Sequence, residues 1–235
     1  MVKKLKKLVL GILIILVVFS LILISLPLPQ GITEILLTAR LNNFLPGCRV
    51  ELDKSKFYFF RGIMAESIRF IKDGQVISTC EKLKLEYEIT LILTGRGKLK
   101  LTSGALNVKK FPAESEFLNF LSNIIGPSFE DELIFNSFLL ESDINKNKLI
   151  MHSFKATGKD LKIVAAGEIE KGRGVDFTVD IFLSKRITET MPEGTKKFLF
   201  EPQKDGFSKI RFEIYGLPKE PSFKIKTQFL ELNVG

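Results

Sequence analysis

The stretch 82-KLKLEYEITLIL-93 alternates apolar and polar side chains more regularly than any other part of the chain. Leucine, tyrosine or isoleucine takes every second position, and lysine, glutamate or threonine fills the gaps as far as Thr90. A period of two is typical of a strand with one apolar and one polar face. We therefore expect one strand across these residues. Its apolar face carries Leu83, Leu85, Tyr87, Ile89, Leu91 and Leu93.

Further strand and turn signals lie on both sides of this stretch. Upstream, Asp73-Gly74 separates two β-like runs and predicts a hairpin. Downstream, the turn 94–97 leads to a strand over 98–108, in which the apolar positions change parity at Gly104. A bulge at that glycine would restore the register. The first half of the chain therefore predicts an antiparallel meander.

The second half changes period once and then returns to strands. Residues 112–126 carry apolar side chains at helical spacing and predict an amphipathic helix that packs on the sheet. Residues 185–208 predict a polar connection without regular structure. The strands expected here are Leu133–Leu140, Lys148–Thr157, Leu161–Glu168, Val175–Leu183, Lys209–Tyr215 and Phe223–Leu232.

The last two of these strands alternate well. In 209–215 the apolar residues Ile210, Phe212 and Ile214 share one face. In 223–232 the same is true of Phe223 and Ile225, with Thr227 and Phe229 continuing the pattern. The fold class is therefore mainly β. Periodicity alone does not separate a sandwich, whose apolar faces cover each other, from a sheet whose apolar face stays open.

The N-terminus predicts a membrane helix. No charged residue occurs from Leu8 to Gln30, and about 20 apolar residues are enough to cross a bilayer. Four lysines precede this segment, which places the N-terminus in the cytoplasm. The alternative is a cleaved signal peptide, but the apolar run is long and 25-SLPLPQ-30 offers no small-x-small site. We expect a signal anchor in residues 1–30, a short amphipathic helix in 32–47, and an extracytoplasmic β domain in 31–235.

The overall charge does not predict nucleic-acid binding. The net charge is +8, but without the four lysines near the N-terminus 31 basic residues remain against 27 acidic ones, a net charge of +4. No later segment is a basic cluster interleaved with aromatic residues. We therefore expect no nucleic-acid partner.

No residue pattern predicts an enzyme, a metal site or a cofactor site. His152 is the single histidine, and it lies on an expected strand without identifiable partners. The two glycine turns near residues 96 and 173 lack the spacing of a phosphate loop. Cys48 and Cys80 are the only cysteines, and they form either a disulfide or two buried free thiols. We expect no catalytic residues.

The order of features resembles the AsmA-like family of envelope proteins. A lysine-led anchor precedes 80-CEKLKLEYEITLILTGRGKLKLTSGALNV-108, which is similar to the recurring strand–glycine–strand unit of that family. The passage 138-FLLESDINKNKLIMHSFKATGKDLKIVAAGEIE-170 is similar to a later one. The closing 212-FEIYGLPKEPSFKIK-226 has Gly216 and Pro221 at matching places, although Leu217 follows the glycine one place early. GspN-type proteins of type II secretion share the same build.

This resemblance implies a single-pass protein of the bacterial inner membrane with its bulk in the periplasm. It implies a taco-like sheet that binds or helps transfer phospholipid in envelope biogenesis. The alternative is a structural or assembly component of an envelope machine, as in GspN-type proteins, with other envelope proteins as partners. In the first case the groove would be lined by Leu83, Leu85, Tyr87, Ile89, Leu91, Ile210, Phe212, Ile214, Phe223 and Ile225.

Overall fold

The computed structural model describes residues 30–42, 47–58, 61–108, 133–217, 220–227, 229 and 231–234. The expected membrane span and the expected helix over 112–126 both lie outside these residues. Among the residues that are described, no helix is long and apolar enough to cross a bilayer.

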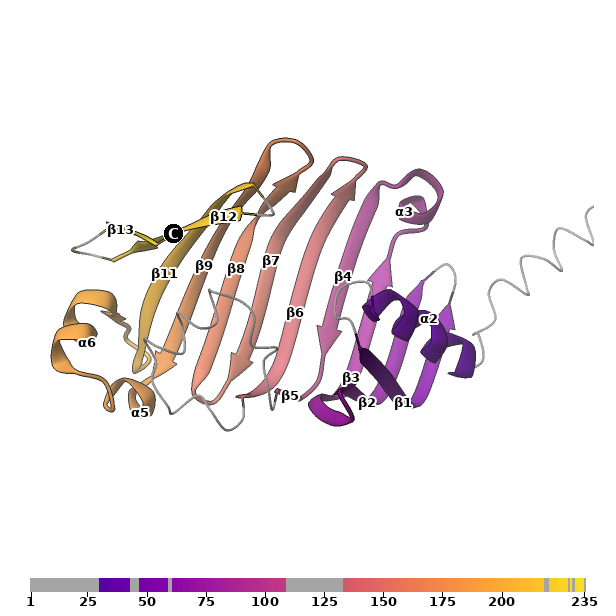
Figure 1. Cartoon of the computed structure of the whole chain (residues 1–235), viewed down its shortest axis with the longest axis horizontal. Helices are drawn as coiled ribbons and strands as arrows, with labels where there is room; N and C mark the ends of the chain where they lie inside the picture. Colours follow the sequence, from indigo (N-terminus) through magenta and orange to yellow (C-terminus); the bar gives the residue numbers. More distant parts are fainter. Residues whose placement is uncertain are drawn as a thin grey trace, which may run out of the picture.

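The thirteen strands in the described part of the chain form a single antiparallel sheet (Figure 1). The sequence-based expectation of a mainly β, antiparallel fold is therefore confirmed. Eleven strands follow one another across the sheet in the order β1-β2-β3-β4-β6-β7-β8-β9-β11-β12-β13, while β5 continues β4 and β10 pairs with β11. Their bounds are β1 Cys48–Tyr58, β2 Gly62–Lys72, β3 Gln75–Tyr87, β4 Gly97–Ser103, β5 Leu106–Val108, β6 Leu133–Asn145, β7 Lys148–Gly158, β8 Leu161–Glu170, β9 Gly174–Ser184, β10 Glu201–Pro202, β11 Phe207–Leu217, β12 Glu220–Lys226 and β13 Glu231–Val234.

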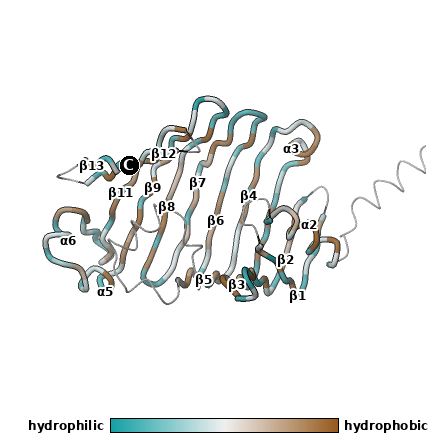
Figure 2. The backbone as a smooth tube through the Cα atoms, viewed as in Figure 1, coloured by the Kyte–Doolittle hydropathy of each residue, from teal (hydrophilic) through white to brown (hydrophobic). Residues whose placement is uncertain are grey.

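Helices occupy the two ends of this sheet. Helix α2 (Gln30–Asn42) lies against the β1 end, and α5 (Lys185–Thr188) and α6 (Glu193–Leu199) lie at the other end (Figure 1). Helix α3 (Ile89–Thr94) is a short turn between β3 and β4. Along the strands, apolar and polar residues alternate, as the hydropathy colouring shows (Figure 2).

The predicted hairpin at Asp73-Gly74 is confirmed. Both residues have a left-handed backbone, with φ of 52° and 75°. Positive φ at both central residues is the requirement of a type I′ turn, which matches the right-handed twist of the strands it joins. The chain therefore turns directly from β2 into β3.

The expected single strand over 82–93 is wrong in its second half. Strand β3 ends at Tyr87, and Ile89–Thr94 forms α3, which closes on Gly95 at φ 70°. The side chain of Glu88 accepts a hydrogen bond from the backbone N–H of Lys98 at 3.1 Å, which helps bring β4 back alongside β3. Ile89–Thr94 has four aliphatic residues among six, which suits a helical turn as well as a strand, so the period alone could not choose.

Two further expectations are corrected near the C-terminus. The expected strand 223–232 is two strands, β12 and β13, and Phe229 lies between them with its side chain exposed. The connection 185–208 is not unstructured, because it contains α5, α6 and β10. It also buries Ile187, Met191 and Phe200 against the sheet.

A crease crosses the sheet from β1 to β6. Successive side chains on the apolar face of a strand are normally two residues apart, but once in each of these strands they are three residues apart. The cross-strand register and the smaller core cluster place this wider step at matching positions of neighbouring strands. We define the crease by the residues that each wider step skips. These are 53–54, 66–67, 81–82, 104–105 and 136–137.

The extra residues are matched across the crease. Leu52 pairs with Ile68 on one side and Ser55 pairs with Ala65 on the other, so the register between β1 and β2 does not change. The parity switch expected at Gly104 is thus confirmed, but every neighbouring strand shares it. The crease ends at β7, where the pairing with β6 shifts by one residue.

The buried side chains form two clusters on the same face. The smaller cluster joins β1, β2 and β3 and includes Val50, Leu52, Ala65, Ile68 and Cys80, with Leu37 of α2 packed against it. The larger cluster spans β6 to β12 and includes side chains from the α5–α6 connection. Leu106 packs against both clusters and links them.

Candidate functional site

The apolar face of the sheet is built from rows of side chains that run across the strands. We name each row by its β3 member. The Leu85 row contains Ile63, Leu85, Leu101, Leu140, Phe154, Ala165, Val179, Phe212 and Ile225, each the register partner of the next. The Tyr87 row contains Tyr87, Leu99, Ser142, Met151, Gly167, Phe177, Ile214 and Phe223.

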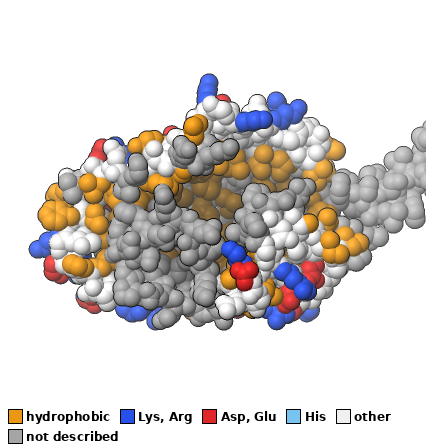
Figure 3. Space-filling model, in the orientation of Figure 1, with side chains coloured by type: hydrophobic (Ala, Val, Ile, Leu, Met, Phe, Trp, Pro, Cys, Tyr) orange, Lys and Arg blue, Asp and Glu red, His pale blue; other side chains and the backbone are white. Residues whose placement is uncertain are grey.

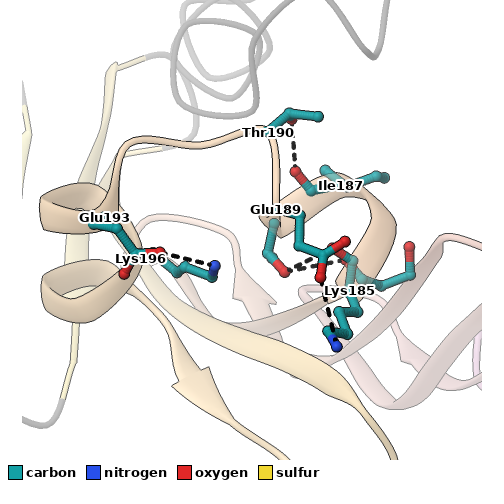
Figure 4. Close-up of polar contacts among 8 residues, drawn as sticks. Lys185, Ile187, Glu189, Thr190, Glu193 and Lys196 are labelled. Atoms are coloured by element: carbon teal, nitrogen blue, oxygen red, sulfur yellow. Dashed lines mark hydrogen bonds and ion pairs between the residues drawn. The ribbon is translucent and has the colours of Figure 1, made fainter.

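Other side chains pack onto the same face of the sheet at both of its ends. At the β1 end Leu37 of α2 packs onto the smaller cluster, and at the other end Ile187, Met191 and Phe200 pack onto the larger one. Figure 4 shows hydrogen bonds and ion pairs within the α5–α6 connection. The Thr190 hydroxyl donates to the carbonyl of Ile187 at 2.7 Å.

Between the covered ends, the face is only half-buried. Leu85, Leu101, Leu140 and Phe154 of the Leu85 row all keep part of their side chains accessible. Leu99 and Met151 of the Tyr87 row do the same. Figure 3 shows hydrophobic side chains gathered in a hollow on this face of the molecule. We call these six residues, together with Tyr87, the central strip.

The β3 residues predicted to line a groove all lie on this face. Leu83, Leu85 and Tyr87 point to one side of the sheet and are half-buried. The Tyr87 hydroxyl donates to the backbone carbonyl of Tyr58 at 3.3 Å, which holds the ring in place. Burial raises the pKa of Tyr87 above its usual value, so the ring stays uncharged.

Ile89 and Leu91 are not part of the strand face. They belong to α3, beyond the end of β3. The neighbouring Leu93, which the pattern also placed on the strand, is 72% exposed. The strand assignment is therefore wrong for all three residues, because the chain leaves the sheet at Glu88.

The β11 and β12 residues that were predicted to line the groove divide into two groups. Ile210, Phe212 and Ile225 are almost completely buried in the larger cluster and serve as core. Ile214 and Phe223 pair with each other in the Tyr87 row and are half-buried. The structure thus brings β3 and β11–β12 residues into the same rows, separated by five intervening strands.

The residues that sequence reasoning missed come from the middle of the sheet. Leu99 and Leu101 alternate with lysines in the same way as the β3 leucines do, so this signal was present. Leu140 and Phe154 had no such signal, because β6 and β7 both contain irregular steps in their pairing. Phe154 also contacts Phe138, with ring centroids 6.2 Å apart.

The opposite face of the sheet is polar and paired. Lys100 contacts Glu141 across β4 and β6 at 2.8 Å, and Arg211 binds Asp180 with two hydrogen bonds of 2.6 and 2.7 Å. A hollow of about 500 Å³ opens on this face at the crease, lined by side chains such as Arg69 and Glu81. Arg69 is already paired with Glu51 at 3.2 Å.

The remaining candidate groups are dispersed. His152 is exposed on β7 and its Nε2 lies 2.9 Å from Asp143. The two cysteines are free and buried on β1 and β3, with β2 between them, and burial raises the pKa of both thiols. Within the described ranges, no three His, Cys, Asp or Glu side chains gather to form a metal site.

Comparisons with protein-family models, with curated proteins and with solved structures find no match to this chain.

Proposed function

We propose that this protein is an AsmA-like, membrane-anchored periplasmic protein whose apolar sheet face binds phospholipid acyl chains and helps transfer them in envelope biogenesis. The observation that carries the proposal is the central strip. Along the Leu85 row it is apolar and continuous across β3, β4, β6 and β7, whereas in the Tyr87 row the buried Ser142 lies between Leu99 and Met151. The side chains of the strip stay half-buried between two covered ends of the sheet. A closed sandwich core would bury such residues.

An acyl chain is a suitable occupant for such a strip. Covering apolar surface contributes about 0.8 kcal/mol per buried methylene, without any need for polar partners. The rows run perpendicular to the strands, so a linear chain lying along them meets apolar side chains from one strand after another. The taco-like form of the sheet and the bacterial inner-membrane location belong to this proposal.

The size of the sheet limits the role. Neighbouring strands lie about 4.8 Å apart, so eleven strands extend over about 50 Å. In our proposal this is too short to bridge two membranes, and another envelope protein receives the lipid. We propose no enzymatic activity, no cofactor and no nucleic-acid partner.

A photo-crosslinking experiment tests whether lipid occupies the central strip. The full chain would carry p-benzoylphenylalanine at Phe154, which faces the strip, and in a matched variant at Lys155, the next residue on the polar face of β7. After irradiation in membranes, mass spectrometry of the purified chain is expected to find phospholipid adducts at position 154 and none at 155. Leu101 and Lys100 provide a second pair on β4.

The outcome separates the two candidate functions. A folded chain without lipid adducts at 154 and 101 would overturn lipid binding. Adducts to a protein at these positions would favour the alternative, an assembly component of an envelope machine. The observation behind that alternative is the edge strand β1, where the residues that follow Leu52, beyond the two backbone groups bound by α2, could pair with a further strand.

A further inference from the structure

Helix α2 packs one face against the described sheet and leaves apolar side chains exposed on another face. On the inner face Thr33 is buried and Leu37 packs against the smaller core cluster. On the outer face Ile32, Ile35 and Leu36 are 46%, 69% and 47% exposed. Their spacing of three and four places them in one stripe along the helix. We call these three residues the α2 stripe.

The inner face of α2 also fixes the helix to the edge of the sheet. The backbone N–H of Val50 donates to the Thr38 hydroxyl at 3.3 Å. The side-chain amide of Gln30 donates to the backbone carbonyl of Leu52, at the N-terminal end of the helix. Both backbone groups belong to β1, so α2 is held against the first strand at two points about two helical turns apart.

We infer that the α2 stripe lies in the boundary between headgroups and acyl chains of a phospholipid bilayer, and holds the β1 end of the sheet at the membrane surface. The inference rests on the proposed membrane anchor. The uncharged segment from Leu8 ends at Gln30, the first residue of α2.

Chain length leaves α2 no freedom to move away from such an anchor. From Leu28 to Gln30 the chain can extend by at most about 7 Å. Ile32 follows within about 3 Å of helix. A stripe of three large aliphatic side chains this close to the end of a membrane span meets lipid before it meets water, and interfacial helices bury such faces about 5–10 Å deep.

The consequence concerns the proposed lipid path. With α2 bound on one side to the bilayer and on the other to β1, the apolar rows begin next to the membrane. They end at β12, where Ile225 and its β11 partner Phe212 are buried in the larger core cluster. This assigns the β1 end as the side from which membrane lipid enters the central strip.

The test measures the depth of α2 in vesicles. The full chain would be reconstituted in phosphatidylcholine–phosphatidylglycerol vesicles with an environment-sensitive fluorophore at Ile35→Cys. Cys48 and Cys80 are 1% and 3% exposed, so the label goes to the added thiol. Lys171→Cys, in the exposed turn between β8 and β9, is the matched control. Ile32→Cys provides a second position in the stripe.

We expect lipids with a spin label near the headgroup to quench the label at positions 35 and 32 several-fold more strongly than at 171. Equal, weak quenching at 35 and 171 would overturn the inference. A shielded label at 35 that spin-labelled lipid does not quench would also overturn it, because a second copy or another protein then covers the stripe. Release of the wild-type chain from the vesicles by an alkaline wash would overturn the anchor as well. Failure to find lipid adducts at Phe154 would leave the α2 result unaffected.

Discussion

Ser67 has a left-handed backbone, with φ of 52°, in the middle of strand β2. This conformation costs a non-glycine residue about 1–2 kcal/mol. It persists here because Ala65 and Ile68, on either side, are both buried in the smaller core cluster. The strain therefore comes from the crease. Ala65 and Ile68 are three residues apart and face the same side, which requires one residue between them to adopt an unusual backbone conformation.

Substitution of Ser67 tests this account of the crease. Ser67→Val is expected to lower the free energy of unfolding by about 1–3 kcal/mol, because a β-branched side chain resists positive φ. Ser67→Gly relieves the strain and is expected to be neutral or slightly stabilising. Chemical denaturation of both variants measures the difference. If Val and Gly at this position gave the same stability, backbone strain would not be the cause.

At the scale of one element, Asp160 ties α5 to the sheet. Its carboxylate accepts hydrogen bonds from Arg186 Nε at 3.0 Å and Nη2 at 2.6 Å, and from the Ser184 hydroxyl at 2.7 Å. The hydrogen bonds from Arg186, with that of Ser184, hold the pKa of Asp160 below its usual range. A depressed pKa in the folded state stabilises the fold at neutral pH, and this stabilisation is lost as the pH falls below about 4.

Asp160→Asn is therefore expected to destabilise the protein by about 1 kcal/mol at neutral pH. The difference from the wild type should shrink on acidification, because the wild-type carboxylate is then protonated as well. Urea denaturation at a series of pH values measures this. Glu189→Gln is the control, since Glu189 lies on the exposed end of the same segment, 3.5 Å from Lys185. A destabilisation by Asp160→Asn that is independent of pH would contradict the assignment.

The elements that sequence could predict are those whose signal is local. The Asp73-Gly74 hairpin follows from the two residues that occupy the turn, β7, β8 and β9 follow from the glycine- and asparagine-containing turns that bound them, and β11 follows from alternation. The end of β3 could not be predicted, because Ile89 to Leu93 fits a helical turn as well as a strand. Whether this segment forms a helix or a strand depends on Gly95, which closes the helix, and on the pairing of β4 with β3. Neither is visible in the alternation of apolar and polar residues.

The candidate site was predictable only in part, for a related reason. Alternation identifies which residues of one strand share a face, and this is why Leu83, Leu85 and Tyr87 were found. It does not identify how far each face is covered by other elements. Phe212 and Ile225 have the same pattern as Leu85, yet they are core because the α5–α6 connection packs over their end of the sheet.

For the whole molecule, the two core clusters raise the question of whether the sheet unfolds as one unit. Leu106 is the residue that packs against both clusters among those described. Leu106→Ala is expected to destabilise by about 1–3 kcal/mol and to separate the opening of β1–β3 from that of β8–β11. Native-state hydrogen exchange of strands β2 and β9 measures the two openings.

Val108→Ala is the matched control for this substitution. Val108 lies on the same short strand and is also half-buried, but it belongs to neither cluster. If both variants left β2 and β9 with one common opening free energy, Leu106 would not be the link. The sheet would then be cooperative through its backbone pairing alone.

The crease also limits how this chain can change length. Five neighbouring positions along the sheet, at 53–54, 66–67, 81–82, 104–105 and 136–137, carry a matching extra residue. Deleting one residue at 66–67 would return β2 to the ordinary spacing of two while β1 and β3 kept their extra residue, so Ile68 and Phe70 would lose register with their partners on both strands. Insertions and deletions in these strands are therefore tolerated only in concert, whereas the turns beyond the crease are free to vary in length one at a time.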